Sequence, residues 1–294
     1  MIKIEGQGGI SATIIQDSTA NGIRITTFEL EYPRFIHAEL MTHRMFSRNA
    51  ASSRAIPIEA VLKRISENPA TPIHWGKNQP GMQASAQLEG NELVEAQEMW
   101  YEASVTAIEF SGILDELHVH KQIANRITEP FQFMKTVVTA TEWENWYSLR
   151  YHKDAQPEIQ ELAHCMLNAH ITSTPMQLRY GDWHVPYVQR KLVEGQIWYH
   201  QGDTVIDKTT ACIISASCCA QVSYRKNDDS LEKAKDIYNK LVSMTPKHSS
   251  PFEHQARVPI SIEEAWEEGY THMGRNKQMW SGNFKGWLQY RQLL

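Results

Sequence analysis

One run of regularly spaced apolar residues constrains the fold of this chain more than any other feature. Between Glu92 and Leu117 an apolar side chain recurs at every third or fourth position. This spacing matches the turn of an α-helix and predicts one long amphipathic helix over residues 92–117. Its predicted buried stripe consists of Leu93, Ala96, Trp100, Ala103, Ala107, Phe110, Leu114 and Leu117.

Three further helices are predicted downstream. The first covers residues 119–131 and stops at Pro130. The second covers residues 155–171, where Pro157 suits a first helical turn because no N–H is needed there. The third covers residues 229–244, where Asp229 and Glu232 fit a capping box. The buried stripes are predicted to be Ile159, Leu162, Ala163, Met166 and Ala169 in the second, and Leu231, Ala234, Ile237, Tyr238 and Leu241 in the third.

Strands and loops occupy other parts of the chain. β-Branched and aromatic residues predict a strand from Gly22 to Glu31, with a break at Pro33. Residues 252–261 predict another strand, whereas the small residues of 211–224 fit a buried strand or a helix. Residues 66–91 are rich in Pro, Gly, Asn and Gln and predict a long loop, either a surface connector or a lid over a ligand.

These elements belong to one domain. A chain of 294 residues suffices for one large domain or two small ones, and no compositional linker divides it. With 41% hydrophobic residues it can bury a full core. We therefore expect a single α+β domain over residues 1–294, rich in helices and with a small mixed or antiparallel sheet.

Composition disfavours several classes of function. The net charge of -5 disfavours binding to duplex nucleic acid. No stretch approaches the length of an apolar membrane span, so we expect neither a span nor a signal peptide. The cysteines show no zinc or redox spacing and the paired His118 and His120 would face apart, which predicts no metal site and a reduced, cytoplasmic protein. We expect core positions for Cys165, Cys212, Cys218 and Cys219.

Residues 41–57 are the strongest candidate for a ligand site. They read MTHRMFSRNAASSRAIP, with three arginines and hardly any large apolar side chain after Phe46. Guanidinium groups give phosphate bidentate hydrogen bonds, and small side chains let backbone N–H groups approach the same ligand. If residues 42–44 are extended, His43 points away from its two neighbours, so one segment could serve two ligands. Composition alone fits a solvated basic loop equally well.

The order of the polar residues resembles the signature of the flavin-dependent thymidylate synthases. That signature is His-Arg, two residues, Ser, one residue, Asn, two residues, Ser, one residue, Arg. The strand, proline and helix before the segment resemble the same family. The matching positions are His43, Arg44, Ser47, Asn49, Ser52 and Arg54.

Other stretches resemble further blocks of that family. Residues 141–163 resemble a later helix with Asn145 and Arg150, and Arg126 stands where the family has another nucleotide-contacting arginine. Residues 220–241 and 247–254 resemble the family's opening block, in which a His, a Ser and a Glu line the flavin site. In the family this block precedes the arginine signature, so the resemblance implies a permuted member. The equivalents here are His248, Ser250 and Glu253.

The resemblance implies a flavin-dependent methyltransferase. It implies transfer of a one-carbon unit from methylenetetrahydrofolate to C5 of a pyrimidine deoxynucleotide, most of all dUMP, with FAD as cofactor and NADPH as reductant. It also implies a homotetramer. Its implied FAD contacts are His43, Arg44, Asn145, His248, Ser250 and Glu253. Its implied nucleotide contacts are Glu39, Ser52, Arg54, Arg126 and Arg150, of which Arg150 and Arg126 would be catalytic by stabilising negative charge on the pyrimidine.

The sequence departs from the family pattern around the signature. Thr42 stands in place of an Arg and Glu39 in place of a Gln, while Ala50 and Ala55 replace a Glu and a Tyr. Losing a cation and gaining a carboxylate weakens phosphate binding unless another group compensates. Two alternatives therefore stay open. One is hydroxymethylation, or methylation of another pyrimidine nucleotide such as dCMP; the other is a catalytically silent flavin- or nucleotide-binding homologue.

Overall fold

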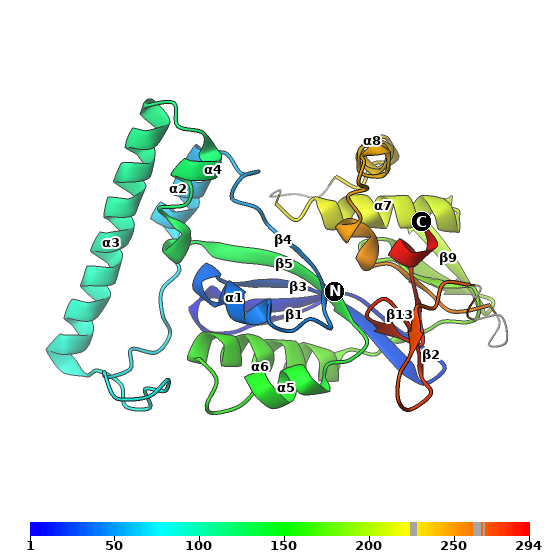
Figure 1. Ribbon diagram of the computed structural model, residues 1–294, viewed down its shortest axis with the longest axis horizontal. Coiled ribbons are helices and arrows are strands. Elements are labelled where there is room, and N and C mark those ends of the chain that lie inside the picture. Colours follow the sequence, from blue (N-terminus) through cyan, green and yellow to red (C-terminus); the bar gives the residue numbers. More distant parts are fainter. Residues whose placement is uncertain (224–227, 261–265, 267) are drawn as a thin grey trace.

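The protein has a mixed α+β fold, as the sequence predicts, built on one largely antiparallel sheet (Figure 1). The structure is a computed structural model and describes residues 1–223, 228–260, 266 and 268–294. The strand order is β1-β2-β3-β5-β4, and β6 pairs with β2 in parallel. The strands are β1 (Ile2–Glu5), β2 (Ser11–Ala20), β3 (Ile23–Pro33), β4 (Ser47–Ala50), β5 (Phe133–Ala140) and β6 (Met176–Gln177).

One face of this sheet carries the main apolar core. Side chains alternate along a strand, so Phe28, Leu30 and Tyr32 of β3 all point to this face. Helix α6 (Pro157–Thr172) covers it, and the short helices α1 (His37–Leu40) and α5 (Glu144–Arg150) lie beside it (Figure 1). The predicted stripe of α6 is confirmed, since all of its members are fully buried: Ile159, Leu162, Ala163, Met166 and Ala169.

The opposite face of the sheet is polar and nevertheless buried. Thr27 of β3 and Thr139 of β5 share a hydrogen bond of 2.7 Å. Thr27 Oγ1 also bonds His184 Nε2 at 2.8 Å, and Thr139 Oγ1 bonds His254 Nδ1 at 2.9 Å. All four residues are fully buried. Because leaving such a group unpaired costs about 1–3 kcal/mol, these bonds fix how the C-terminal part of the chain sits on the sheet.

The C-terminal part adds two helices and three small sheets to the right of the main sheet in Figure 1. Helix α7 (Lys208–Ala220) is rich in small residues and mostly buried after its exposed first turn, and it packs against α8 (Leu231–Ser243). The strands are β7 (Trp183–His184), β8 (Gln189–Val193), β9 (Gln196–Gln201), β10 (Thr204–Ile206), β11 (Ala256–Arg257), β12 (His272–Met273), β13 (Met279–Ser281), β14 (Phe284–Lys285) and β15 (Leu288–Gln289). The 3-10 turns are η1 (Gln7–Gly9), η2 (Arg34–Ile36), η3 (Glu129–Phe131), η4 (Ser250–Glu253) and η5 (Tyr290–Leu293).

An arm of helices projects from the other end of the sheet. It consists of α2 (Ile58–Glu67), α3 (Gly90–Glu116) and α4 (Lys121–Ala124), with a long loop between α2 and α3 as predicted (Figure 1).

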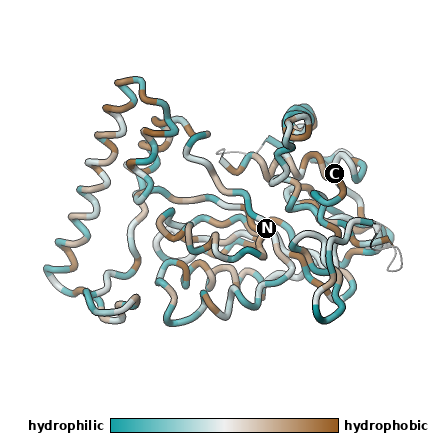
Figure 2. The backbone as a smooth tube through the Cα atoms, in the orientation of Figure 1, coloured by the Kyte–Doolittle hydropathy of each residue, from teal (hydrophilic) through white to brown (hydrophobic). Residues whose placement is uncertain are grey.

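The long helix α3 is confirmed, but its predicted stripe is wrong in part. The buried residues of α3 are Ser104, Ala107 and Ser111, whereas Phe110 is 54% exposed and Leu117 is 67% exposed. Small residues face α2 and α4 because they permit close approach; the Ser111 hydroxyl, for example, donates to a carbonyl of α4. Figure 2 shows hydrophobic positions left at intervals along α3.

Three local predictions are wrong. Residues 119–131 form only the single turn of α4 and the turn η3, because the Asn125 side chain donates to the carbonyls of Ser53 and Ile56 and holds the chain in a bend. Helix α8 is capped by Ser230 rather than by Asp229. Of the described residues 252–260 only β11 is a strand, because η4 occupies the start of the segment, and Ser261 lies outside the described residues.

Two questions left open by the sequence are answered. Residues 211–220 are helical, as part of α7, while Tyr224 lies outside the described residues. The expected core positions of the cysteines are confirmed, and burial raises the pKa of all four thiols, that of Cys165 to about 11. Among the described residues, no helix is long and apolar enough to cross a membrane.

The buried histidines predict a pH dependence of stability. Burial lowers the pKa of His254 to about 3, whereas an unfolded histidine titrates near pH 6.5. The unfolded chain therefore binds more protons between these values, so the free energy of unfolding falls as the pH falls below about 6.5. His254→Gln should make this slope shallower by about 1.4 kcal/mol per pH unit, measured by urea denaturation at several pH values. An unchanged slope would show that His254 is not held neutral by folding.

Candidate functional site

The signature segment runs along one edge of the main sheet. It enters through turns at residues 41–46, continues as β4, and leaves as an irregular stretch before α2. The strand β4 pairs only with β5 within the described residues, so its other side is a sheet edge. The two ends of the segment are therefore held apart by the length of β4. Residues 42–44 are not extended as the sequence analysis supposed, but His43 is buried while Thr42 and Arg44 are exposed.

Arg150 is the centre of the polar contacts at the first end. Its Nε donates to His43 Nε2 at 2.9 Å, and its Nη1 forms an ion pair with Glu39 Oε2 at 3.1 Å. Its Nη2 donates to Thr42 Oγ1 at 3.2 Å. All three nitrogen atoms of the guanidinium are thus engaged, and the side chain has one fixed orientation.

The neutral form of His43 is part of this arrangement. The ring lies against Trp146, with centroids 4.7 Å apart, and stacks near Phe46. Burial, with a smaller contribution from the neighbouring Arg150 and Arg48 cations, lowers the pKa of His43 to about 4. Because Nε2 accepts from Arg150, the ring proton resides on Nδ1 at neutral pH.

Two residues that depart from the family pattern, Glu39 and Thr42, contact Arg150. Glu39 and Thr42 replace a Gln and an Arg of the pattern, and both now bind this guanidinium. The new carboxylate partly neutralises Arg150, and the shorter Thr42 removes a cation that would have lain beside it. Both substitutions lower the local positive charge, and both residues now hold the Arg150 guanidinium in place.

The second end of the segment borders a cavity. The cavity has a volume of about 510 Å³ and lies between α2, the end of β5 and residues 222–223. Ala51 and Ser223 line it, and the Ser52 N–H donates to Ser223 Oγ at 2.9 Å. Basic side chains in its wall are Lys63, Arg64 and Lys135.

Several predicted site residues are exposed and uncommitted. Arg44, Arg54, Asn145 and His248 are exposed, and within the described residues their side chains form no hydrogen bond or ion pair. Arg126 is also exposed but forms an ion pair with Glu129 at 2.7 Å. The uncommitted side chains are available to a ligand, whereas His43 and Arg150 are already bound to each other.

The segment with His248, Ser250 and Glu253 packs directly on the signature strand. The turn η4 contacts β4, and Gln289 Nε2 joins them by donating to Ser47 Oγ and to the Glu253 carbonyl, each at 3.1 Å. Asn49 Nδ2 reaches the carbonyl of Cys219 at 3.1 Å. Segments about two hundred residues apart in sequence are thus neighbours in one chain.

The Glu253 side chain is engaged elsewhere. It pairs with Arg291, and its charge also opposes the lowering of the Arg48 pKa by burial. Arg48 itself donates to the carbonyls of Met41 and His43, at 2.8 and 3.2 Å, and so shapes the turn before β4.

Sequence comparison decides the family. A sequence profile described as "Thymidylate synthase complementing protein" matches residues 24–176, more than half of the chain. The chain belongs to this family. The resemblance to the flavin-dependent thymidylate synthases is therefore confirmed, and the protein is a thymidylate synthase-like methyltransferase. The matched region contains the signature segment, Arg126, Asn145 and Arg150, and it ends before the block with His248.

Two solved structures with a similar fold are crystal structures of the UMP/dUMP methylase PolB from Streptomyces cacaoi. The one bound with 5-Br dUMP has a TM-score of 0.48 and 17% identity, and the match covers 57% of this chain and 92% of that chain. The one bound with 5-Br UMP has a TM-score of 0.47 and 18% identity, with 57% and 91% covered. No curated protein matches the sequence.

Sequence reasoning missed three groups at this site. It did not foresee that Glu39 and Thr42 would hold Arg150, although their departure from the pattern was the signal. It gave no role to Arg48, which looked like one more cation for a ligand. It also could not place Ser223, whose partner Ser52 lies far away in sequence.

The contact between Arg150 and His43 predicts a coupled titration. Arg150→Gln removes a neighbouring positive charge and should raise the pKa of His43 from about 4. The new value should stay below about 6.5, because burial is the larger cause and remains. NMR titration of the His43 ring protons measures the change. Arg126→Gln is the matched control and should leave this pKa unchanged; an equal shift in both variants would contradict the contact.

Proposed function

We propose that the protein transfers a one-carbon unit from methylenetetrahydrofolate to C5 of a pyrimidine deoxynucleotide, with dUMP as the favoured substrate and FAD as cofactor. One observation carries the proposal. In this member of the family the edge strand β4 is flanked by two arginines, Arg44 before it and Arg54 after it, whose side chains have no partner among the described residues. Two anionic ligands can then bind one segment without competing for the same cation.

The residues at the first end fit a phosphate-bearing flavin cofactor. Arg44 is an exposed guanidinium without a carboxylate partner among the described residues, and Asn145 is an exposed amide with free donors and acceptors. From the permuted block, η4 approaches the same strand, which supports a role for His248, Ser250 and Glu253 in the same site. When bound, the reduced flavin would supply the hydride that completes the methyl group.

Arg150 is the proposed catalytic residue. As C5 of the pyrimidine becomes nucleophilic, negative charge builds on the ring oxygens, and a fixed cation stabilises it. Contacts with His43, Glu39 and Thr42 hold the guanidinium in place before the substrate arrives, so little reorganisation is needed. One preorganised donor of this kind is worth about 3 kcal/mol in the transition state.

Arg126 is a second proposed nucleotide contact. Its ion pair with Glu129 is exposed, and exposed pairs contribute only about 0–1 kcal/mol. An anionic ligand can therefore displace Glu129 from Arg126 at small cost.

The nucleotide phosphate is proposed to lie at the second end, on Ser52 and Arg54. Small neighbours leave the backbone open to a ligand, and the adjacent cavity of about 510 Å³ has room for a nucleotide. The cavity wall contains Lys63, Arg64 and Lys135 beside Glu31 and Glu67. Lys135 pairs with Glu29, and Lys63 lies near Glu67. Arg64, which has no ion pair among the described residues, is therefore the cation available to an anion.

Glu39 favours a second candidate substrate, a cytosine nucleotide. Its Oε2 binds Arg150, and within the described residues its Oε1 accepts no hydrogen bond. A carboxylate oxygen accepts from the N4 amino group of cytosine but repels the O4 oxygen of uracil. If Glu39 faces the base, the chain would methylate or hydroxymethylate dCMP.

The remaining parts of the proposal concern partners and surroundings. We propose NADPH as the reductant, a cytoplasmic location, and a homotetramer. The exposed apolar residues of α3, among them Met99, Phe110 and Leu117, support assembly because so much apolar surface on one helix favours a protein contact.

Product analysis tests the function. The protein is incubated with reduced FAD, methylenetetrahydrofolate and either dUMP or dCMP, and the nucleotides are analysed by mass spectrometry. We expect dUMP to gain the mass of one CH2 unit, because a methyl group replaces the hydrogen on C5. A hydroxymethyl product, or reaction of dCMP alone, would establish the alternative substrate or product. Bound ligands without turnover would establish a silent homologue.

The division of the signature segment predicts opposite effects of two matched substitutions. Arg54→Lys keeps the charge but loses the bidentate fork, and should weaken nucleotide affinity by about 1–3 kcal/mol while sparing FAD. Arg44→Lys should weaken FAD binding by a similar amount while sparing the nucleotide. Calorimetric titration of each ligand measures both effects. If Arg54→Lys loses FAD instead, the assignment of the two ends is wrong.

Glu39→Gln restores the residue of the family pattern and tests the choice of base. If the Glu39 carboxylate faces the base, the variant should bind dUMP more tightly relative to dCMP, by at least about tenfold. Thr42→Ser, which keeps the hydroxyl on Arg150, is the control and should leave the ratio unchanged. Competition between the two nucleotides in a calorimetric titration gives this ratio, and an unchanged ratio in Glu39→Gln would remove the argument for dCMP.

A further inference from the structure

A second cavity lies at the opposite edge of the main sheet from the signature strand. β4 forms one edge, whereas β1 and β6 pair along the outer side of β2 at the other. β1 pairs with residues 11–14 of β2 and β6 with residues 18–19, so residues 15–17 of β2 have no strand partner on this side among the described residues. This gap in pairing opens a cavity of about 610 Å³.

Arg190 of β8 lines this cavity and is held firmly in place. Its Nη1 donates to Ser18 Oγ at 2.8 Å and its Nη2 donates to the Asp17 carbonyl at 3.1 Å. Both acceptors are uncharged. Three of the five N–H groups of the guanidinium remain without a partner among the described residues.

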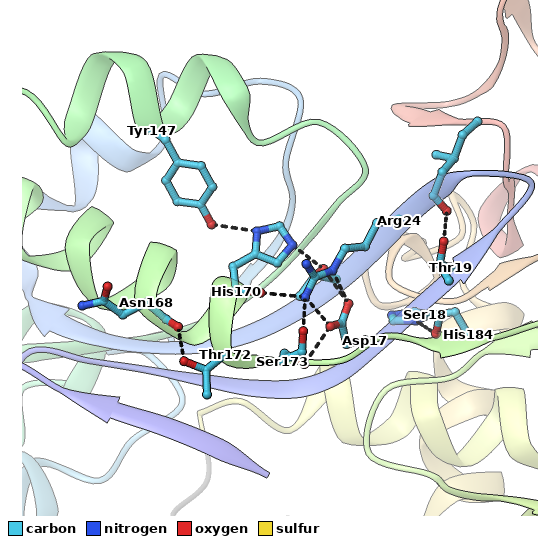
Figure 3. A network of polar contacts seen from close by, with 12 residues as sticks. Asp17, Ser18, Thr19, Arg24, Tyr147, Asn168, His170, Thr172, Ser173 and His184 are labelled. Atoms are coloured by element: carbon cyan, nitrogen blue, oxygen red, sulfur yellow. Dashed lines mark hydrogen bonds and ion pairs between the residues drawn. The ribbon is translucent and has the colours of Figure 1, made fainter.

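The nearest carboxylates are already bound to other groups. The Asp17 carboxylate forms two hydrogen bonds with Arg24, at 2.9 and 2.5 Å, and further bonds with Thr26 and Ser173 (Figure 3). Asp182 pairs with Lys208 at 3.4 Å. Each negative charge thus has its own cation, and Arg190 leaves one positive charge uncompensated.

Burial is unfavourable for a guanidinium and lowers the pKa of Arg190 to about 10, and the nearby Asp17 and Asp182 carboxylates, both bound to other cations, oppose this only in part. A neighbouring basic residue, Lys191, also lines the cavity and increases the local positive potential. An anion in the cavity would relieve this cost by supplying the missing negative charge.

A buried chain of hydrogen bonds holds the Ser18 hydroxyl to which Arg190 donates. Ser18 Oγ bonds His184 Nδ1 at 2.7 Å, and His184 continues through Thr27 and Thr139 to His254. An arginine can only donate, so the Ser18 hydroxyl accepts from Arg190 and can itself donate to His184 Nδ1. Every member from Ser18 to His254 is fully buried. The guanidinium is therefore preorganised rather than mobile.

We propose that this cavity is a second binding site, separate from the signature segment, which takes the phosphate or carboxylate group of a small molecule on Arg190. The planar fork of a guanidinium matches either oxyanion in a bidentate manner. Thr174 and Gln189 offer uncharged polar groups in the same wall, and the volume admits a metabolite larger than the anion alone.

Titration of two simple anions tests the site. Inorganic phosphate and succinate are titrated calorimetrically, at low ionic strength, into the wild type and into Arg190→Gln, Arg190→Lys and Arg54→Gln. We expect binding of at least one anion to weaken at least tenfold in Arg190→Gln, less in Arg190→Lys, and to persist in Arg54→Gln. The anion that responds identifies the chemical class.

A crystal soak locates the bound anion in the wild-type protein, so it does not depend on whether a variant folds. Wild-type crystals are soaked in tungstate, a heavy-atom analogue of phosphate, and a peak in contact with Arg190 is expected. Lys191→Gln, an exposed change at the same wall, should weaken binding of the responding anion about threefold. Equal binding of both anions to wild type and a folded Arg190→Gln, or no binding of either at millimolar concentration together with no tungstate at Arg190, would overturn the proposal.

Discussion

The hydrogen-bonded row of threonines and histidines on one face of the sheet determines the rest of the structure. Thr27 and Thr139 present hydroxyl groups where a sheet of this size would ordinarily bury apolar side chains. His184 and His254 satisfy them from the C-terminal part of the chain. Because the partners must match in position and in hydrogen-bonding role, this face admits one placement of the C-terminal part. That placement brings η4 onto the signature strand.

The consequences for the site follow from this placement. The block with His248 to Glu253 comes about two hundred residues after β4 in the sequence and yet lies against it. On the other face of the sheet, α5 carries Arg150 to the turn that contains His43. The candidate site is thus assembled from both faces at one sheet edge, and its two ends serve different proposed ligands.

Periodic features of the sequence predicted a good part of the fold. The stripe of α6 and the length of α3 follow from spacing alone, although α3 buries small residues rather than its predicted apolar stripe. Failures occurred where a distant group intervened. Asn125 bends the chain by binding Ser53 and Ile56, and no local pattern shows that contact. The sequence analysis also did not predict the strands β2 and β5, in which adjacent apolar residues such as Ile14-Ile15 and Val137-Val138 interrupt the alternation of apolar and polar positions.

At the site, too, sequence spacing predicted some features, whereas contacts between distant residues determined others. The spacing of the signature identified the family and the segment, whereas the partners of Arg150 became visible only in three dimensions. Glu39 and Thr42 had looked like losses for a nucleotide site, and the structure shows them acting together on one guanidinium. The sequence pattern showed where the chain differs from its family, and the structure shows that both differing residues bind Arg150.

A crystal structure of the protein with both FAD and dUMP tests the central claim most directly. The claim is that the two ends of β4 bind different ligands. The account predicts FAD in contact with Arg44 and the turn η4, and the dUMP phosphate within hydrogen-bonding distance of Ser52 and Arg54. A single ligand spanning both ends, or the dUMP phosphate bound at Arg44, would contradict it.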